Sequence, residues 1–132
     1  MERRRIGSGS DWERRGGYSR AVVVDRHVFV AGTAPIMPGD ADPPADAYGQ
    51  MRRCLEIVEA ALREAGGGLE HVVRTRIFVT DASFASDVLR AHGQAFAEAR
   101  PASTGVVVGL FDPRWLVELE VEALLPPPEP AG

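Results

Sequence analysis

The sequence predicts a single α+β domain in which a mixed β-sheet carries two helices on one face. Three observations support this fold class: an element order of ββαβαββ, helices with one apolar side each, and strands in which polar and apolar residues alternate. A length of 132 residues and a hydrophobic content of 45% suit one domain with a buried core. The expected organisation is a loose N-terminal leader over residues 1–16, the domain over 17–125 and a proline-rich tail over 126–132.

The first predicted element of the domain is a β-hairpin from Tyr18 to Gly32. Its two runs, 21–24 and 28–31, are rich in valine and phenylalanine, and Asp25–His27 forms the turn between them. The following segment, Ala34–Pro44, is rich in proline and is predicted to be a loop, because proline cannot donate to a sheet or a helix.

Two helices follow, separated by a strand. The first helix is predicted at Ala45–Ala65, where Met51, Leu55, Val58 and Leu62 recur at spacings of four, three and four. Glycines 66–68 end it, since glycine adopts the left-handed conformation found at helix ends. A strand is predicted at Val72–Thr80 and a second one-sided helix at Ser83–Ala99.

Two strands close the fold, at Thr104–Gly109 and Leu116–Leu124, joined by a turn at Asp112–Arg114. Hairpins imply antiparallel pairing, and a helix between strands implies a parallel crossover, so the sheet is expected to be mixed. Since each helix has only one apolar side, both are expected to pack side by side on the same face of the sheet.

The opposite face of the sheet is predicted to be charged. Side chains alternate along a strand, which places Glu118, Glu120 and Glu122 together on that face. The middle strand is expected to contribute Arg74, Arg76, Phe78 and Thr80 to the same face. Two interpretations stay open: a ladder of exposed ion pairs, each contributing about 0.2–1 kcal/mol, or a cleft partly covered by another subunit. A phenylalanine among the arginines favours some coverage.

Composition excludes several classes of chemistry. The net charge of −4, without a basic stripe, argues against nucleic acid as the main partner. No lysine is present among the 15 basic residues, so a Schiff base on a side-chain amine is excluded. The three histidines are too scattered to predict a metal site. No apolar run is long enough to span a membrane, and the single Cys54, predicted to be a core residue, is consistent with a reducing cytoplasm.

Several blocks of the sequence resemble the Rid family, which is of the YjgF type and is also called L-PSP endoribonuclease-like. Gly17–Ala21 and Val28–Pro35 resemble its first hairpin, and Val72–Asp81 resembles its middle strand. Arg100–Thr104 and Val117–Val121 resemble its signature region. The resemblance implies a chorismate-mutase-like fold and a homotrimer with small clefts between neighbouring subunits, which would cover the charged face.

The resemblance also implies an activity and its residues. The best-known members hydrolyse reactive enamines and imines without a metal or organic cofactor. In them an arginine directly after a Pro-Ala pair holds the substrate carboxylate, and a glutamate on the last strand positions the attacking water. Here Ser103 follows Pro101-Ala102, whereas the glutamate is retained as Glu118, fifteen positions later. A hydroxyl cannot replace the charged, bidentate grip of a guanidinium on a carboxylate.

This departure resembles an arginine-less branch of the family, which also shares Asp11-Trp12-Glu13 and Arg90-Ala91-His92-Gly93. Glu118 is the predicted catalytic residue, as a general base or water-orienting group. The candidate substrate-binding residues are Tyr18, Thr33, Arg74, Arg76, Ser103 and Thr104. Arg20, Arg74 and Arg76 are each considered as a replacement for the missing arginine, although ordinary surface pairing explains them equally well. His92 is predicted to be a core-edge residue.

Three functions are left open for a homotrimer that binds a small metabolite. The leading one is hydrolysis of an imine or enamine in the clefts between subunits. The alternatives are a non-catalytic trimer that binds a small acid, and an endoribonuclease, against which the negative net charge weighs.

Overall fold

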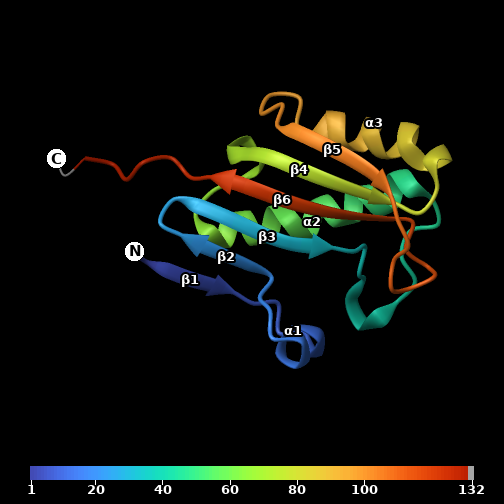
Figure 1. Ribbon diagram of the computed structural model, residues 1–132, viewed down its shortest axis with the longest axis horizontal. Helices are drawn as coiled ribbons and strands as arrows, with labels where there is room; N and C mark the ends of the chain where they lie inside the picture. Colours follow the sequence, from blue (N-terminus) through green and yellow to red (C-terminus); the bar gives the residue numbers. More distant parts are fainter. Residues whose placement is uncertain (131–132) are drawn as a thin grey trace.

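The computed structural model describes residues 1–130 and confirms the α+β fold (Figure 1). Its six strands form one sheet in the order β1-β2-β3-β6-β4-β5. The strands are β1 (Arg3–Ile6), β2 (Ala21–Val24), β3 (His27–Thr33), β4 (Val72–Val79), β5 (Ala102–Val107) and β6 (Val117–Leu124). The α-helices are α1 (Asp11–Gly16), α2 (Ala47–Ala65) and α3 (Ala85–Ala95). Short 3₁₀ turns lie at Pro38–Asp40, Leu69–His71 and Ala82–Phe84.

The sheet is mixed, as expected: β4 and β5 are parallel, and the other neighbouring strands are antiparallel. Helices α2 and α3 lie next to each other behind the same face of the sheet (Figure 1). The core forms where the apolar residues of β6 meet α2, with Val117, Leu119 and Val121 essentially without solvent exposure. Hydrophobic burial of this kind is the main stabilising contribution to the fold.

Helix α2 begins and ends at the residue types that favour those positions. The Asp46 side chain accepts a hydrogen bond from the backbone N–H of Gly49, which satisfies a free donor of the first turn. At the other end Gly66 adopts a left-handed conformation, with φ of 101°. These two caps fix the helix across β3 and β6.

The expected loose leader over residues 1–16 is wrong for most of that segment. Strand β1 extends the sheet by antiparallel pairing with β2, and Ile6 is buried in the core. Arg4 donates a hydrogen bond to the carbonyl of Ala65 at the end of α2, so this arginine is an anchor rather than a free charge. Because only one residue of β1 is buried, the strand lacks the alternation from which it could have been predicted.

Two predicted details also differ from the structure, and a third agrees with it. Val73, expected on the helix side of β4, is 49% exposed, because the pairing of β4 with β6 shifts between Val72 and Arg74. The second helix is shorter than predicted, since a 3₁₀ turn capped by the Asp81 side chain precedes it. The predicted tail shows no regular structure over 126–130, and residues 131–132 of that prediction lie outside the described residues.

Candidate functional site

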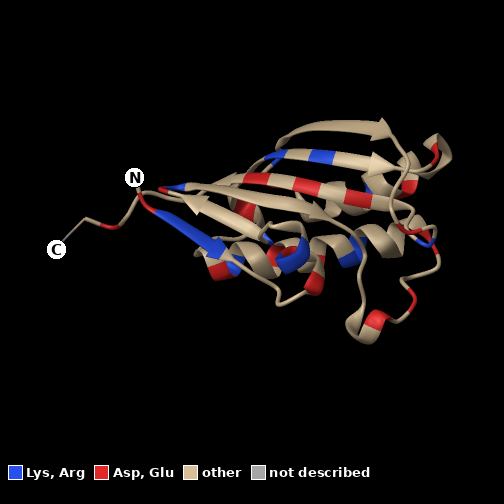
Figure 2. Ribbon diagram, turned by 60° about the horizontal axis from the view of Figure 1, so that its bottom comes forward, with Lys and Arg blue, Asp and Glu red and all other residues tan. Residues whose placement is uncertain are grey.

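The charged face of the sheet is present, with a row of carboxylates on β6 beside the arginines of β4 (Figure 2). Arg76 of β4 pairs with two of these carboxylates: its Nη1 lies 3.0 Å from Glu122 and 3.6 Å from Glu120. Arg74 faces Glu122 in the strand register. This part of the face therefore fits the ion-pair ladder, and Arg76 has its charge already engaged.

Glu118 differs from the other two glutamates because it reaches across the neighbouring strand. A Cβ placed on Gly32 of β3 would lie 2.9 Å from Glu118 Oε2, so the carboxylate occupies space that only a glycine leaves open. The side chain is half-buried there. Burial raises the pKa of Glu118, Arg20 opposes this rise, and Glu120 adds to it.

Arg20 is the cation whose charge opposes the rise in the pKa of Glu118. Its Nη2 donates hydrogen bonds of 2.8 Å to the carbonyl oxygens of both Ala31 and Gly32. Burial lowers the pKa of the guanidinium, while Glu13, Tyr18 and Glu118 oppose that effect. Its Nε is buried and has no hydrogen-bond partner among residues 1–130. Arg20 is thus fixed by the backbone of β3, and its charge acts on both Glu13 and Glu118.

Glu13 on α1 is the second of these carboxylates and is only 8% exposed. It accepts hydrogen bonds from the backbone N–H of Ser8 at 3.0 Å and from the hydroxyls of Ser8 and Ser10. Burial raises its pKa, but these hydrogen bonds and the charge of Arg20 outweigh burial and lower the pKa overall. Sequence reasoning did not select Glu13 or Gly32, although Ser10-x-x-Glu13 has the spacing of a helix capping box.

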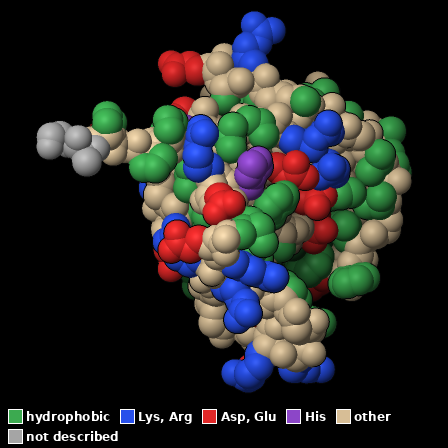
Figure 3. Space-filling view, turned by 60° about the vertical axis from the view of Figure 1, so that its left-hand side comes forward, with side chains coloured by type: hydrophobic (Ala, Val, Ile, Leu, Met, Phe, Trp, Pro, Cys, Tyr) green, Lys and Arg blue, Asp and Glu red, His purple; other side chains and the backbone are tan. Residues whose placement is uncertain are grey.

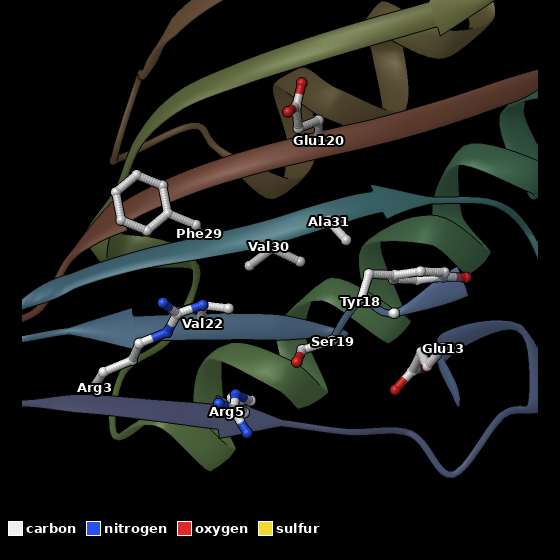
Figure 4. A pocket seen from close by; sticks show the side chains of 11 residues that line it. Arg3, Arg5, Glu13, Tyr18, Ser19, Val22, Phe29, Val30, Ala31 and Glu120 are labelled. Carbon is white, nitrogen blue, oxygen red and sulfur yellow. The ribbon is translucent and has the colours of Figure 1, made fainter. Parts of the chain in front are cut away.

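A broad hollow of about 670 Å³ lies on the same face and shows how Tyr18 is placed. Figure 4 shows Tyr18 and Glu13 at one end of it, with Arg3 and Arg5 along β1 and Phe29 and Glu120 on the far side. Charged side chains surround apolar ones on this side of the molecule (Figure 3). Tyr18 therefore lies exposed in the wall of this hollow, and its contact with a ligand stays a prediction.

Glu118 itself borders a smaller cavity of about 230 Å³. The other walls are Phe78 of β4 and the loop from Val108 to Phe111, in which Phe111 is 95% exposed. A half-buried carboxylate in a mainly apolar cavity is suited to proton transfer, because desolvation makes it a stronger base than an exposed one.

Ser103 does not share this cavity. It lies opposite Thr75 in the parallel register of β5 with β4, and Thr75 is buried toward the helices. Thr75 Oγ1 donates to Ser103 Oγ over 2.8 Å and lies 2.8 Å from His92 Nε2 on α3. In one copy of the chain, Ser103 and Glu118 therefore face opposite sides of the sheet.

The remaining predicted residues lie in different places. Thr104 faces the open side, opposite Arg76. Thr33 has no solvent exposure, and its hydroxyl donates to the carbonyl of Ala31. Within one copy of the chain, its side chain is therefore not open to a ligand. Cys54 is buried in the core, where burial raises its thiol pKa. Within residues 1–130, no cluster of His, Cys, Asp and Glu is arranged to hold a metal, and no helix is long and apolar enough to cross a membrane.

Comparison with known proteins decides the family. The family model described as Endoribonuclease L-PSP matches residues 10–125. The chain belongs to this family. The structure of a member of the YjgF/YER057c/UK114 family from Mycobacterium tuberculosis is 42% identical and superposes with a TM-score of 0.86, covering 94% of this chain and all of the other. The Rid (YjgF) resemblance of the sequence is thereby confirmed.

Two curated relatives extend this result. An uncharacterized protein of Streptomyces coelicolor is 39% identical over 125 residues, which are 91% of this chain and 90% of that protein. The 3-aminoacrylate deaminase RutC of Acinetobacter baylyi is 34% identical over 103 residues, which are 77% of this chain and 82% of that protein. A member of the same family thus acts on an enamine.

Proposed function

We propose that this Rid-family chain hydrolyses an imine or enamine in clefts between the subunits of a homotrimer, with Glu118 activating or orienting the attacking water. The observation that carries the proposal is the placement of Glu118: half-buried over Gly32, beside the fixed cation of Arg20, and open to an apolar cavity. Among the glutamates of β6, it alone combines these features, since Glu120 and Glu122 pair with Arg76.

The chemistry follows from that placement. Glu118 accepts a proton from water as the oxygen attacks the carbon of the C=N bond, and the nitrogen gains a proton. The resulting carbinolamine collapses to a carbonyl compound and ammonia, so that the net reaction consumes one water. A carboxylate with a raised pKa suits both halves of this reaction, because it can accept the proton and return it.

A cleft between copies is supported by the way in which the predicted site residues lie on two opposite faces of the sheet. Ser103 occupies the family's carboxylate-gripping position, yet it faces away from Glu118 in its own copy. The two can share one cleft only if β5 of one copy approaches the open face of another. Strand β5 is exposed along its whole length and carries Val106 and Val107, which is the kind of edge that a second chain covers.

The test uses imines generated in place by an amino-acid oxidase and an amine oxidase, with ammonia release measured. Wild-type protein should accelerate hydrolysis, and Glu118→Ala should abolish most of that acceleration, by roughly 10²–10⁴-fold. Glu122→Ala is the matched control and should retain activity, because its side chain is paired with Arg76. Equal rates for Glu118→Ala and wild type would sink the proposal.

A second function, binding without catalysis, is favoured by one observation: Ser103 stands where the gripping arginine is expected. Thermal-shift measurements with pyruvate and phenylpyruvate would then show stabilisation while every imine is hydrolysed at the uncatalysed rate. The endoribonuclease alternative takes support only from the family's name, and the net charge of −4 weighs against it.

A further inference from the structure

We infer that Ser103, Thr75 and His92 form a hydrogen-bond relay that presents a hydroxyl donor to an uncharged acceptor atom of the ligand, such as a carbonyl oxygen or an imine nitrogen. The ligand class is an uncharged, largely apolar carbonyl or imine compound rather than a carboxylate. The role of this relay in hydrolysis rests on the proposed function. Its role in ligand binding can be tested separately.

The geometry of the relay is set by three neighbouring elements. Thr75 lies at the centre, on β4, with its Oγ1 2.8 Å from Ser103 Oγ on β5 and 2.8 Å from His92 Nε2 on α3. Thr75 has no solvent exposure, and His92 is 9% exposed with the Phe96 ring packed against it. Ser103 is exposed, so the relay runs from the interior to the surface.

The inferred relay assigns one direction of donation. A hydroxyl has one proton to donate, and we assign that of Thr75 to Ser103, whose Oγ lies 2.8 Å away. The contact between Thr75 and His92 is then a hydrogen bond only if Nε2 carries a proton and donates it to Thr75. Burial lowers the pKa of His92, so the ring is neutral near pH 7 and holds its single proton on Nε2. The hydroxyl proton of Ser103 is left free to point outward.

The surroundings of Ser103 select against a charged ligand. A groove of about 390 Å³ lies beside it, between β5 and α3, and is walled by Ile77, Val88, Leu89 and Val106. Among the described residues that line this groove, none is charged. A carboxylate placed there would lose its hydration without gaining an opposite charge, whereas a carbonyl or imine needs only one donor.

The relay also strengthens that donor. In a chain of hydrogen bonds each donor is polarised by the one behind it, so Ser103 donates more strongly than an isolated serine would. An imine nitrogen that accepts this bond carries more positive charge on its carbon, which favours attack by the water that Glu118 holds. Thr75 and His92 act through Ser103 and are therefore positioning residues.

The first experiment reads the relay directly. Nitrogen-15 NMR of the histidine rings, with the signals of His92 assigned by comparison with His92→Gln, should show the proton on Nε2 in the wild type. Thr75→Val, which keeps the shape but removes the hydroxyl, should speed solvent exchange of that proton, and Thr75→Ser should restore wild-type behaviour. A proton on Nδ1 in the wild type would overturn the inference, whether or not any turnover is found.

The second experiment tests the ligand class with two probes that share one ring, cyclohexanone and cyclohexanecarboxylate. Calorimetry should show at least tenfold tighter binding of the ketone to wild-type protein, and Ser103→Ala or Thr75→Val should each weaken it several-fold, with no further loss in the double variant. Ser103→Arg should reverse the preference. Glu122→Ala, whose carboxylate is paired with Arg76 outside this groove, should leave ketone binding unchanged. Tighter binding of the carboxylate to wild-type protein would overturn the inferred ligand class.

Discussion

The two sides of the sheet carry two polar groups of opposite character. Around Glu118 the surroundings are charged: Arg20 is fixed by carbonyls of β3, and its charge acts on both Glu118 and Glu13. Around Ser103 they are neutral: a hydroxyl, a second hydroxyl and an uncharged imidazole lie in line. One side is suited to activate water and the other to donate to an acceptor. The comparison shows that a site without the usual arginine can still offer a hydrogen-bond donor to a ligand, because a chain of neutral donors ends there.

The largest expected effect comes from mixing two inactive variants. Glu118→Ala removes the carboxylate, and Ser103→Trp fills the groove, so each homotrimer alone should be inactive. If each cleft takes Glu118 from one copy and Ser103 from its neighbour, random mixed trimers should recover about a quarter of wild-type activity. Activity is measured after co-refolding, and light scattering checks that trimers form. A mixture as inactive as its parents would contradict a cleft shared between Glu118 of one copy and Ser103 of its neighbour.

The next effect concerns the cation beside Glu118. Arg20→Gln should destabilise the chain by about 2 kcal/mol, because it removes charged hydrogen bonds to the carbonyls of Ala31 and Gly32. It should also raise the pKa of Glu118, since Arg20 is the charge that opposes the effect of burial. The pH at which hydrolysis becomes fast should then move upward, while urea melts report the stability.

Arg76→Gln is the matched control for that experiment. Its guanidinium lies on the same face but is paired with Glu120 and Glu122. The pH profile of hydrolysis should therefore stay where it is in wild-type protein. A shift as large as that of Arg20→Gln would mean that the whole face, rather than the pair Arg20–Glu118, sets the pKa.

A smaller effect is expected from the glycine that makes room for the carboxylate. Gly32→Ala places a methyl 2.9 Å from Glu118 Oε2, so the carboxylate must rotate away. Hydrolysis should fall by up to about 100-fold, the loss that a displacement of a catalytic group by about 1 Å can cause. Gly93→Ala on the exposed side of α3 has open space around the added methyl and should change the rate little. Equal rates for the two variants would show that the position of Glu118 over β3 is unimportant.

Much of this arrangement follows from the sequence, and particular residues show where that stops. Alternation along β6 predicts that Glu118, Glu120 and Glu122 share a face, and the burial of Val117, Leu119 and Val121 confirms it. The same rule fails at Val73, since a shift in strand pairing leaves no signal in the residues themselves. The predicted leader failed for a related reason, because β1 has a single buried residue and depends on its neighbour for its structure.

The site is harder to predict than the fold because it depends on register between strands. Nothing in the spacing of Ser103 and Glu118 shows that they face opposite sides of the sheet; that follows from the pairing of Ser103 with Thr75 and of Glu118 with Phe78. The relay to His92 is likewise invisible in the sequence, where a histidine on a helix side is typical of a core edge. Glu13 had a local signal in its capping-box spacing with Ser10.

The smallest predicted effect is on stability and separates the ionic side from its neutral counterpart. In the folded chain burial raises the pKa of Glu118, so the folded state binds this proton more tightly than the unfolded state does. Protonated Glu118 therefore contributes to the stability of the fold. This contribution is complete below the pKa of a glutamate in the unfolded chain, about 4.3, and is lost as the pH rises through the pKa of Glu118 in the folded chain. Near neutral pH the folded chain therefore carries a desolvated negative charge at a cost.

Glu118→Gln removes that cost. Its melting temperature near neutral pH should exceed that of wild type by roughly 2–5 °C, the shift that corresponds to about 1 kcal/mol, and the gain should vanish near pH 4. Glu122→Gln, which loses the 3.0 Å pair with Arg76, should show no gain at either pH. Calorimetric melts of the three proteins at both pH values measure the difference. A gain for Glu118→Gln that persists in acid would trace the stabilisation to packing rather than to charge, and Glu118 would then not be the perturbed base that the ionic side of the sheet requires.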